Sequence, residues 1–342
     1  MTTTDTPAPL QEIIRRTKAS KSTILRVLNG ELKGNYARVA KRHEQIRRIA
    51  DELNYRPSYA GKTVARQKTQ TVGLLYPIDD PRLSNNYAAS VHHLATALAR
   101  HGYDLALHAI DRNQPMSSDL LLDRRFDGYV VHDYVPDTIA EAIDRAKLPC
   151  VAINAGRRDD MVCIDIDNEA NAAAMVDYLR SHGHQRIAWV RPDRGVDPAM
   201  PHPSVAKREV GYRNAVDKAG VPACVFDSTA EAVACVASQP VADRPTALMA
   251  YKATRAAELL YALAKAGLTV PNDVSVVSFD DPDFAAISLP PLTVMRVPFD
   301  EFGIHAADLV VNAIEDMPGE HLTLPLTLIE RESVAQPPPG GA

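Results

Sequence analysis

The stretch LQEIIRRTKASKSTILRVLN, residues 10–29, decides the fold of the N-terminal part of this chain. In its first half, one apolar stripe recurs at the spacing of a helix face and predicts a short helix with Leu10, Ile13, Ile14 and Thr17 on that face. Ser20 then offers a hydroxyl N-cap for a second helix. The inward face of that second helix is predicted to hold Ile24, Val27 and Leu28.

A third helix is predicted after a polar loop. Asn29-Gly30 ends the second helix, and the third begins near Val39 with a buried stripe of Ile46, Ile49, Ala50 and Leu53. Three short helices with a tight turn between the first two form a helix-turn-helix unit, whose second helix enters the DNA major groove. A three-helix bundle that binds no DNA also has an exposed polar face, so the pattern alone leaves that alternative open.

Charge favours the DNA-binding interpretation. Residues 1–69 hold 15 Lys and Arg against 6 Asp and Glu, although the whole chain has a net charge of −5. A basic head on an acidic body favours the approach of one end to a phosphate backbone, because each neutralised phosphate releases counterions. On the outward face of the second helix, Lys21 and Arg26 can reach base edges and Thr23 can reach a phosphate.

A membrane surface would also attract a basic head, but other features count against it. No apolar run approaches the roughly 18 residues of a spanning helix, and no basic amphipathic helix carries bulky aromatic residues. Residues 1–9 form a polar tail that is predicted to be neither a signal nor an anchor. We therefore expect a cytoplasmic protein without a membrane partner, associated with the nucleoid when it is bound to DNA.

The segment PSYAGKTVARQKTQ, residues 57–70, is polar and basic and is predicted to be a linker. Its Gly61-Lys62-Thr63 looks like the end of a phosphate-binding loop. That loop needs a glycine where Arg56 stands, and no strand precedes it, so nucleotide binding is not favoured.

From residue 71 onward, short β-branched or apolar runs alternate with helix-length segments: TVGLLYP, YDLALHA, DGYVVHD, PCVAIN, CIDID, RIAWV, TALMAY and VSVVSFD. Such alternation predicts βαβ units, that is, parallel sheets with helices on both faces. The segment is longer than one doubly wound sheet usually needs. Two α/β lobes with a ligand cleft between their strand ends are therefore predicted.

These stretches resemble a known family. Residues 10–29 and the later ELNYRPS are similar to the DNA-binding head of the lactose-repressor (LacI) family, and KREVGYRNAV, PPLTVMRVPF and LIERESVA are similar to stretches of its body. The resemblance implies an all-α helix-turn-helix head over residues 1–56, a hinge over 57–70, and a periplasmic-binding-protein-like body over 71–342 that binds an effector and dimerises. The chain is then expected to cross between the lobes three times, near Ile166, near Pro290-Pro291 and near Leu322 to Leu324.

The resemblance also implies roles for single residues in DNA binding. Lys21 and Ser22 match the two specificity positions, and Arg26 matches the arginine that reads a base. Val64 matches the wedge that the hinge helix, formed only on specific DNA, inserts into the minor groove. The positions that match phosphate contacts are Ser20, Thr23 and Asn29.

For the effector, the resemblance implies three further contacts. Arg208 matches an arginine that grips hydroxyl or carboxylate groups, Asp280 an acid that accepts hydroxyl hydrogen bonds, and Tyr87 an aromatic residue that covers a sugar face.

The chain departs from the family in the body and in the head. In the body, Tyr251-Lys252 stands where Asn-Asp is usual, which makes that side of the ligand cleft more positive and suggests an anionic effector such as a sugar acid or phosphosugar.

In the head, Thr17-Lys18 replaces the small residues that are usual in the turn, Ile14 and Leu25 replace a usual Ala and a usual Ser, and the loop after Asn29 is about four residues longer than usual. Because of these departures together, the usual operator sequence is not expected.

Enzyme chemistry is not predicted. The sequence has no H-E-x-x-H, G-x-S-x-G or G-x-G-x-x-G motif, and its cysteines lack metal-ligand spacing, so no metal and no cofactor are expected. Cys150, Cys163, Cys224 and Cys235 are expected to be buried free thiols. Two acidic clusters remain candidates for acid/base or metal sites: Asp165, Asp167 and Glu169, with Asp167 alternatively a helix N-cap, and Asp280, Asp281 and Asp283.

The family resemblance predicts a homodimer that presents two heads to operator DNA and changes its affinity when a sugar or sugar derivative alters the lobe angle. Repression is the commoner outcome in the family. A ligand-dependent activator or corepressor-type regulator stays open, as does a cytoplasmic solute-binding protein, although the latter predicts no helix-turn-helix spacing. The tail VAQPPPGGA has no leucine heptad, so a dimer is expected rather than a tetramer.

Overall fold

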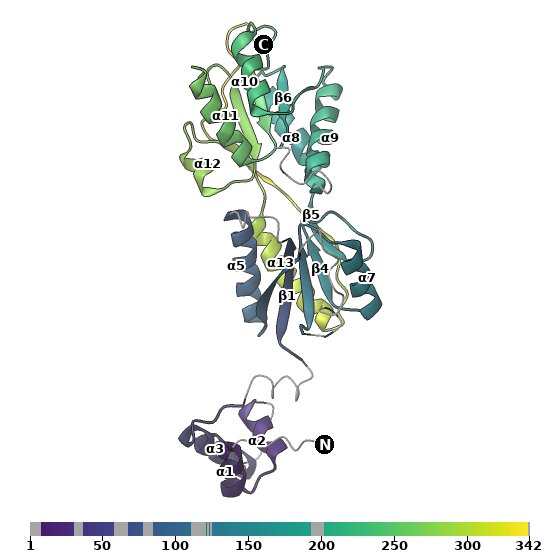
Figure 1. Ribbon diagram of the computed structural model, residues 1–342, viewed down its shortest axis with the longest axis vertical. Helices are drawn as coiled ribbons and strands as arrows, with labels where there is room; N and C mark the ends of the chain where they lie inside the picture. Colours follow the sequence, from purple (N-terminus) through teal and green to yellow (C-terminus); the bar gives the residue numbers. More distant parts are fainter. Residues whose placement is uncertain are drawn as a thin grey trace. The chain divides into compact units, whose positions relative to one another are not determined.

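The computed structural model describes residues 8–30, 37–57, 68–77, 85–110, 121, 123, 125–192 and 202–340, with the main chain alone at 37, 77 and 85–87. The chain divides into two compact units, Met1–Gln70 and Thr71–Ala342 (Figure 1).

The first unit is a helical head. Its helices are α1 (Ala8–Thr17), α2 (Lys21–Leu28) and α3 (Ala37–Glu52), so α3 begins two residues earlier than the apolar stripe indicates. The predicted stripes meet in one core, in which Ile13, Ile24 and Ile46 are fully buried. Leu28 and Leu53 pack against the edge of that core rather than in its centre. Burial of these aliphatic side chains is the main stabilising contribution to so small a unit.

The second unit contains two α/β lobes. The first lobe has a six-stranded parallel sheet in the order β11-β5-β4-β3-β1-β2. The strands in chain order are β1 (Thr71–Pro77), β2 (Asp104–Ile110), β3 (Gly128–His132), β4 (Cys150–Ile153), β5 (Val162–Ile166) and β11 (Leu322–Leu324). The helices of this lobe are α5 (Asn85–Arg100), α7 (Asp137–Ala146) and α13 (Phe299–Ile314).

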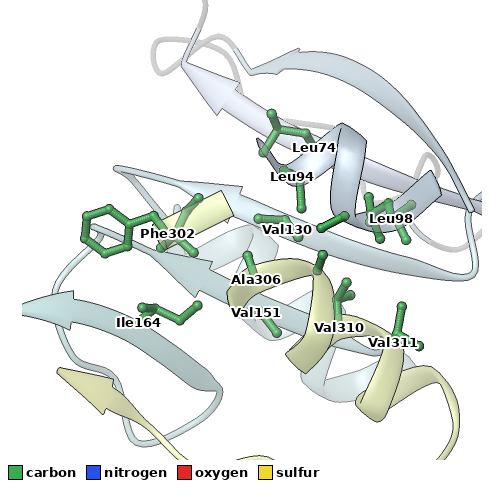
Figure 2. Close-up of a cluster of buried hydrophobic side chains, with 14 of the residues drawn as sticks. Leu74, Leu94, Leu98, Val130, Val151, Ile164, Phe302, Ala306, Val310 and Val311 are labelled. Carbon is green, nitrogen blue, oxygen red and sulfur yellow. The ribbon is translucent and has the colours of Figure 1, made fainter. Parts of the chain in front are cut away.

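The first sheet is buried on both faces, which is why its strands read as nearly continuous apolar runs. Helices α5 and α13 cover one face, and Figure 2 shows Leu94 and Leu98 of α5 and Phe302 and Val310 of α13 directed at the same core as Val130 of β3. Helix α7 covers the other face through Ile139 and Ile143, among others.

The second lobe has a six-stranded sheet in the order β12-β10-β9-β8-β6-β7, in which only β12 is antiparallel to its neighbour β10. Its strands are β6 (Ile187–Val190), β7 (Cys224–Phe226), β8 (Ala247–Ala250), β9 (Ser275–Phe279), β10 (Thr293–Arg296) and β12 (Thr327–Ile329). Its helices are α8 (Asn168–Ser181), α9 (Pro203–Lys218), α10 (Thr229–Ser238), α11 (Ala253–Lys265) and α12 (Asp283–Ile287).

The chain passes between the lobes at three places. It crosses after β5 at Asp167, after β10 at Val297-Pro298, and between β11 and β12. The middle crossing therefore lies beyond the Pro290-Pro291 position expected from the sequence. Those prolines precede β10, and β10 still pairs with β9 in the second sheet.

Candidate functional site

The recognition helix of the head is α2. Ser20 caps it in an extended conformation (φ −66°, ψ 152°), with its Oγ accepting from the Thr23 main-chain N–H at 3.1 Å. Ile24 and Val27 anchor the helix in the core, which leaves Lys21, Ser22 and Arg26 exposed. Thr23 and Asn29 are half-buried, and Val64 lies outside the described residues. The side chains with base-reading roles implied by the family resemblance thus lie on the solvent side of α2.

In the body, Arg208 of α9 is the central charged group of the candidate effector site. Its side chain is only 5% exposed. Nε donates to the Asn168 side-chain oxygen at 2.9 Å, Nη1 donates to the Tyr251 main-chain oxygen at 3.0 Å, and the guanidinium lies 4.1 Å from the centre of the Phe279 ring. Both hydrogen-bond acceptors are neutral, so among the described residues this buried cation has no direct ion pair. An uncompensated buried charge is costly, and a ligand anion or hydroxyl group would relieve that cost.

A close approach of two helices places Arg208. Gly211 lies where a Cβ atom would collide with the main chain of Glu169 on α8. The absence of that atom lets α9 lie close enough to α8 for Arg208 to reach Asn168.

Asp280 directly follows β9 and lies within electrostatic range of Arg208; we call the part of the second lobe that holds these two residues the effector wall. Its φ of +70° turns the chain there, and its main-chain N–H donates to Met295 O at 3.1 Å. Burial raises the pKa of the Asp280 carboxyl, while the nearby charges of Arg208 and Lys252 act in the opposite direction. The expected residues Arg208, Lys252 and Asp280 are therefore close enough to interact electrostatically. Asp281 instead forms an ion pair with Arg331 at 2.8 Å.

Tyr251 follows β8 and was expected to face the ligand cleft, but its side chain is packed inside the second lobe. Its hydroxyl lies 2.8 Å from Ser204 Oγ, its ring meets the edge of Trp189, and it is 8% exposed. Burial raises the pKa of its phenol, which keeps the hydroxyl protonated. The phenol thus links α9 to β8, and an effector contact by Tyr251 stays a prediction. Lys252 is half-buried at the start of α11, and the side chain of Tyr87 lies outside the described residues.

A hydrogen-bonded series next to these residues joins the two lobes. His202 precedes α9 and places Nε2 2.5 Å from Asn154 O in the first lobe, while its Nδ1 lies 2.7 Å from Ser204 Oγ. Asn154 donates through Nδ2 to Asp133 Oδ1 at 2.7 Å, and His132 Nδ1 lies 2.9 Å from the same oxygen. We call His132, Asp133, Asn154, His202 and Ser204 the interlobe series.

Sequence reasoning missed the interlobe series, although a signal was present. Asp133 and Asn154 directly follow the buried strands β3 and β4. Polar residues at the carboxyl ends of parallel strands line the ligand edge of an α/β sheet.

A pocket of about 180 Å³ lies beside the first and third crossings and is lined by residues that include Asp165, Glu169, Lys207, His321 and Thr323. Neither Arg208 nor Asp280 lines it. Asp167 accepts from Ala170 N at 2.9 Å and caps α8, which confirms its N-cap assignment. Within the described ranges, no three His, Cys, Asp or Glu side chains are arranged to hold a metal ion.

The four cysteines are free thiols, as expected, with Cys150 and Cys163 buried and Cys224 and Cys235 half-buried. No helix in the described part of the chain has the length and apolar character to cross a membrane.

Several known proteins are similar to this chain. Residues 176–334 match the family model of a periplasmic binding protein-like domain. The HTH-type transcriptional repressor PurR of Vibrio atlanticus is 26% identical over 96% of this chain and 98% of its own length. The ribose operon repressor of Escherichia coli K12 is 28% identical over 95% of this chain and 99% of its own.

Among solved structures, the lac repressor dimer bound to operator and the anti-inducer ONPF is similar, with a TM-score of 0.78 and 20% identity, covering 96% of this chain and 100% of that chain. The similarity therefore extends through both compact units.

Proposed function

We infer, because the chain belongs to the lactose-repressor (LacI) family of transcription regulators, that it is a DNA-binding transcriptional repressor controlled by a small molecule. One combination of features supports this function best. The same chain carries a recognition helix with exposed Lys21, Ser22 and Arg26, and a two-lobed body in which Arg208 of α9 lies near Asp280 at the end of β9. The head binds operator DNA and the body senses the effector.

The effector is a sugar or sugar derivative, and an acidic group on it fits this wall best. Arg208 and Lys252 are two cations near the carboxylate of Asp280, and the carboxylate of Asp133 is also within electrostatic range. A guanidinium with neutral acceptors only can pair bidentately with a carboxylate or phosphate. A relative is named as the repressor of a ribose operon, which agrees with a carbohydrate-like effector.

The active species is a homodimer. The second lobe carries the three most exposed large apolar side chains of the described residues. Tyr261 on α11 is 70% exposed, Ile287 at the end of α12 is 83% exposed, and Leu289 just after α12 is 92% exposed. Neighbouring exposed apolar residues mark protein contacts, and a second copy of this chain is the expected occupant. The hinge, including Val64, is expected to take part in the paired DNA-bound form.

This function requires no reaction chemistry, so the protein is proposed to be a regulator rather than an enzyme. It acts in the cytoplasm, on the nucleoid when bound to DNA, without a membrane partner. Repression fits the names of the curated relatives.

The test starts with selection of duplexes from random-sequence DNA by the full-length chain. Affinity for the selected operator is then measured with sugars, sugar acids, sugar phosphates and nucleobases. We expect one ligand class to change operator affinity at least about fivefold, as in typical allosteric coupling. Arg208→Met should remove the response and keep ligand-free DNA binding.

Three results would count against parts of this proposal. If no sequence is enriched, the chain is not a sequence-specific DNA-binding protein. A full response by Arg208→Met would place the effector elsewhere. A neutral hexose that binds tightly in calorimetry, and equally to Lys252→Ala, would exclude the acidic effector class.

A further inference from the structure

The turn before the recognition helix has an unusual main-chain conformation. Lys18 has a φ of +51°, in the left-handed region that L residues other than Gly and Asn seldom adopt. Its N–H donates to Ile14 O at 2.8 Å. Its carbonyl oxygen accepts from Nη2 of Arg42 on α3 at 3.3 Å. Arg42 thus holds the turn from a helix that is distant in sequence.

This contact fixes the position of the Arg42 charge. Lys18 lies two residues before Ser20, the N-cap of α2, so the guanidinium lies beside the end of the recognition helix that approaches DNA. The first turn of α2 contains no acidic residue, so no carboxylate of that turn offsets the positive end of the helix dipole. Lys18 and Lys21 are exposed there as well.

Three other arginines of the head pair with carboxylates. Glu12 pairs with Arg15 at 2.6 Å and with Arg16 at 2.7 Å, and Glu52 pairs with Arg16 at 3.2 Å and with Arg48 at 3.7 Å. Within residues 8–30 and 37–57, no carboxylate lies within ion-pair distance of Lys18 or Arg42. Among these described residues, the two cations at the turn therefore differ from Arg15, Arg16 and Arg48 in having no carboxylate partner.

We propose that Arg42 is a DNA-phosphate contact that also positions the turn, and that Arg42 and Lys18 together hold the backbone next to the operator half-site. This proposal rests on the proposed function, because it assigns a further residue to the same DNA interface. A guanidinium pairs bidentately with phosphate oxygens and reads no base, so the contact adds affinity independently of sequence. It also keeps α2 at a fixed angle to α3.

The test uses the full-length chain and a short random-sequence duplex, since a phosphate contact does not require the operator. Affinity is measured between 0.05 and 0.2 M salt. Arg42→Gln should lower the slope of log K against log salt by about 0.9 per head, or about 1.8 per dimer, and weaken binding roughly tenfold per head at 0.1 M. Arg42→Lys, which keeps the charge, should keep most of the slope.

Arg48→Gln is the matched control, because it removes the same charge from the same helix at a position paired with Glu52. Its slope should change by less than half as much. An unchanged slope for Arg42→Gln, or an equal change for Arg48→Gln, would overturn the proposal.

A measurement on the unmodified sequence covers the case in which Arg42→Gln disturbs the head. Phenylglyoxal labelling read by mass spectrometry should show Arg42 protected several-fold by the duplex and Arg48 unprotected; labelling of Arg42 that the duplex does not slow would also overturn the proposal. If selection enriches no operator, the proposed function fails, while both measurements with random duplex still report on Arg42.

Discussion

His202 Nε2 lies 2.5 Å from the main-chain oxygen of Asn154, and this hydrogen bond joins the two lobes. The Ser204 N–H donates to His202 Nδ1 at 3.1 Å, so Nε2 carries the ring hydrogen and donates to Asn154. Ser204 in turn contacts Tyr251, whose main-chain oxygen accepts from Arg208. The lobe angle and the effector wall therefore share one hydrogen-bonded series.

His202→Ala should loosen the lobe angle. The lost hydrogen bond corresponds to about 1 kcal/mol, enough to change the populations of closed and open forms about fivefold. Small-angle scattering of the ligand-free chain should give a larger radius of gyration than the wild type. His182→Ala is the control, because His182 bonds within its own lobe to Tyr178 O. Equal radii of gyration for the two variants would show that the hydrogen bond between His202 and Asn154 does not restrain the lobe angle.

Arg208→Met should cost little stability although it removes a buried residue. The guanidinium has no direct ion pair among the described residues, so its loss also removes the cost of burying a charge; the expected loss is below about 2 kcal/mol. Arg331→Met should cost more, about 3 to 5 kcal/mol, because it leaves the Asp281 carboxylate without its partner. Urea unfolding checks both values, and the reverse order would contradict this account of Arg208.

The same substitution can be followed optically. Trp189 is the only tryptophan, it is fully buried, and it packs against Tyr251 and Phe279. Effector binding at Arg208, which lies over the Phe279 ring, should therefore change tryptophan emission in the wild type and not in Arg208→Met.

Lys18→Gly should stabilise the head by roughly 0.5 to 1 kcal/mol while weakening DNA binding. Glycine adopts a positive φ without the steric cost that lysine bears at +51°. Hydrogen exchange of the intact chain should slow in α1 and α2. Lys147→Gly makes the same conformational change in the other unit, because Lys147 has a φ of +49° at the end of α7, although it also removes an exposed ion pair with Asp144 at 2.8 Å. Faster exchange in the head of Lys18→Gly would show that the lysine is not strained.

Stability should fall in mild acid because of His184. This side chain is fully buried between Thr246 Oγ1 and Ala335 O, both at 2.9 Å, and burial lowers its pKa to about 4. The unfolded pKa is about 6.5, so the stabilisation is present above pH 6.5 and is lost as the pH falls toward 4. Between pH 7 and pH 5 the loss is about 2 kcal/mol.

The comparison is with His184→Gln in urea unfolding at both pH values. The variant should be less stable at pH 7 but should lack this part of the pH dependence. Parallel curves for the two proteins would mean that His184 takes up no extra proton on unfolding.

Leu289→Asp should produce a monomer in light scattering coupled to size exclusion. Leu289 is 92% exposed and lies two residues after the exposed Ile287 of the second lobe, whereas Met317, 45% exposed after α13, provides a control for adding a charge at an exposed apolar site elsewhere. Dimers that persist in Leu289→Asp would place the contact between copies elsewhere.

Much of the fold could be predicted because the local signals agree with the final packing. The stripes through Ile13 and Ile24 form the head core, and the eight apolar runs of the body all became strands. The three-residue strand β7 gave no comparable signal, because its side chains are only half-buried. The middle crossing was misplaced since prolines indicate a break in the chain but not which sheet the next strand joins.

The site was less predictable than the fold. Arg208 and Asp280 follow from the family resemblance, but their proximity depends on how closely helix α9 packs on α8, beside the end of β9. His202 precedes a helix and carries no pattern, so its contact with Asn154 depends on two lobes that are distant in sequence. Arg42 belongs to a generally basic helix, and it differs from Arg48 in its contact with Lys18 O and in the ion pair that Arg48 makes with Glu52.

The late strands β11 and β12 each close the edge of a different sheet. Ribosomes make the N-terminal side first, so during synthesis both lobes wait for strands that begin only at Leu322 and Thr327, whereas the three helices of the head emerge within the first 52 residues. The part that grips DNA therefore emerges well before the part that restrains it. A prematurely ended chain would carry a complete head but neither finished sheet, so effector control requires that synthesis reach β11 and β12.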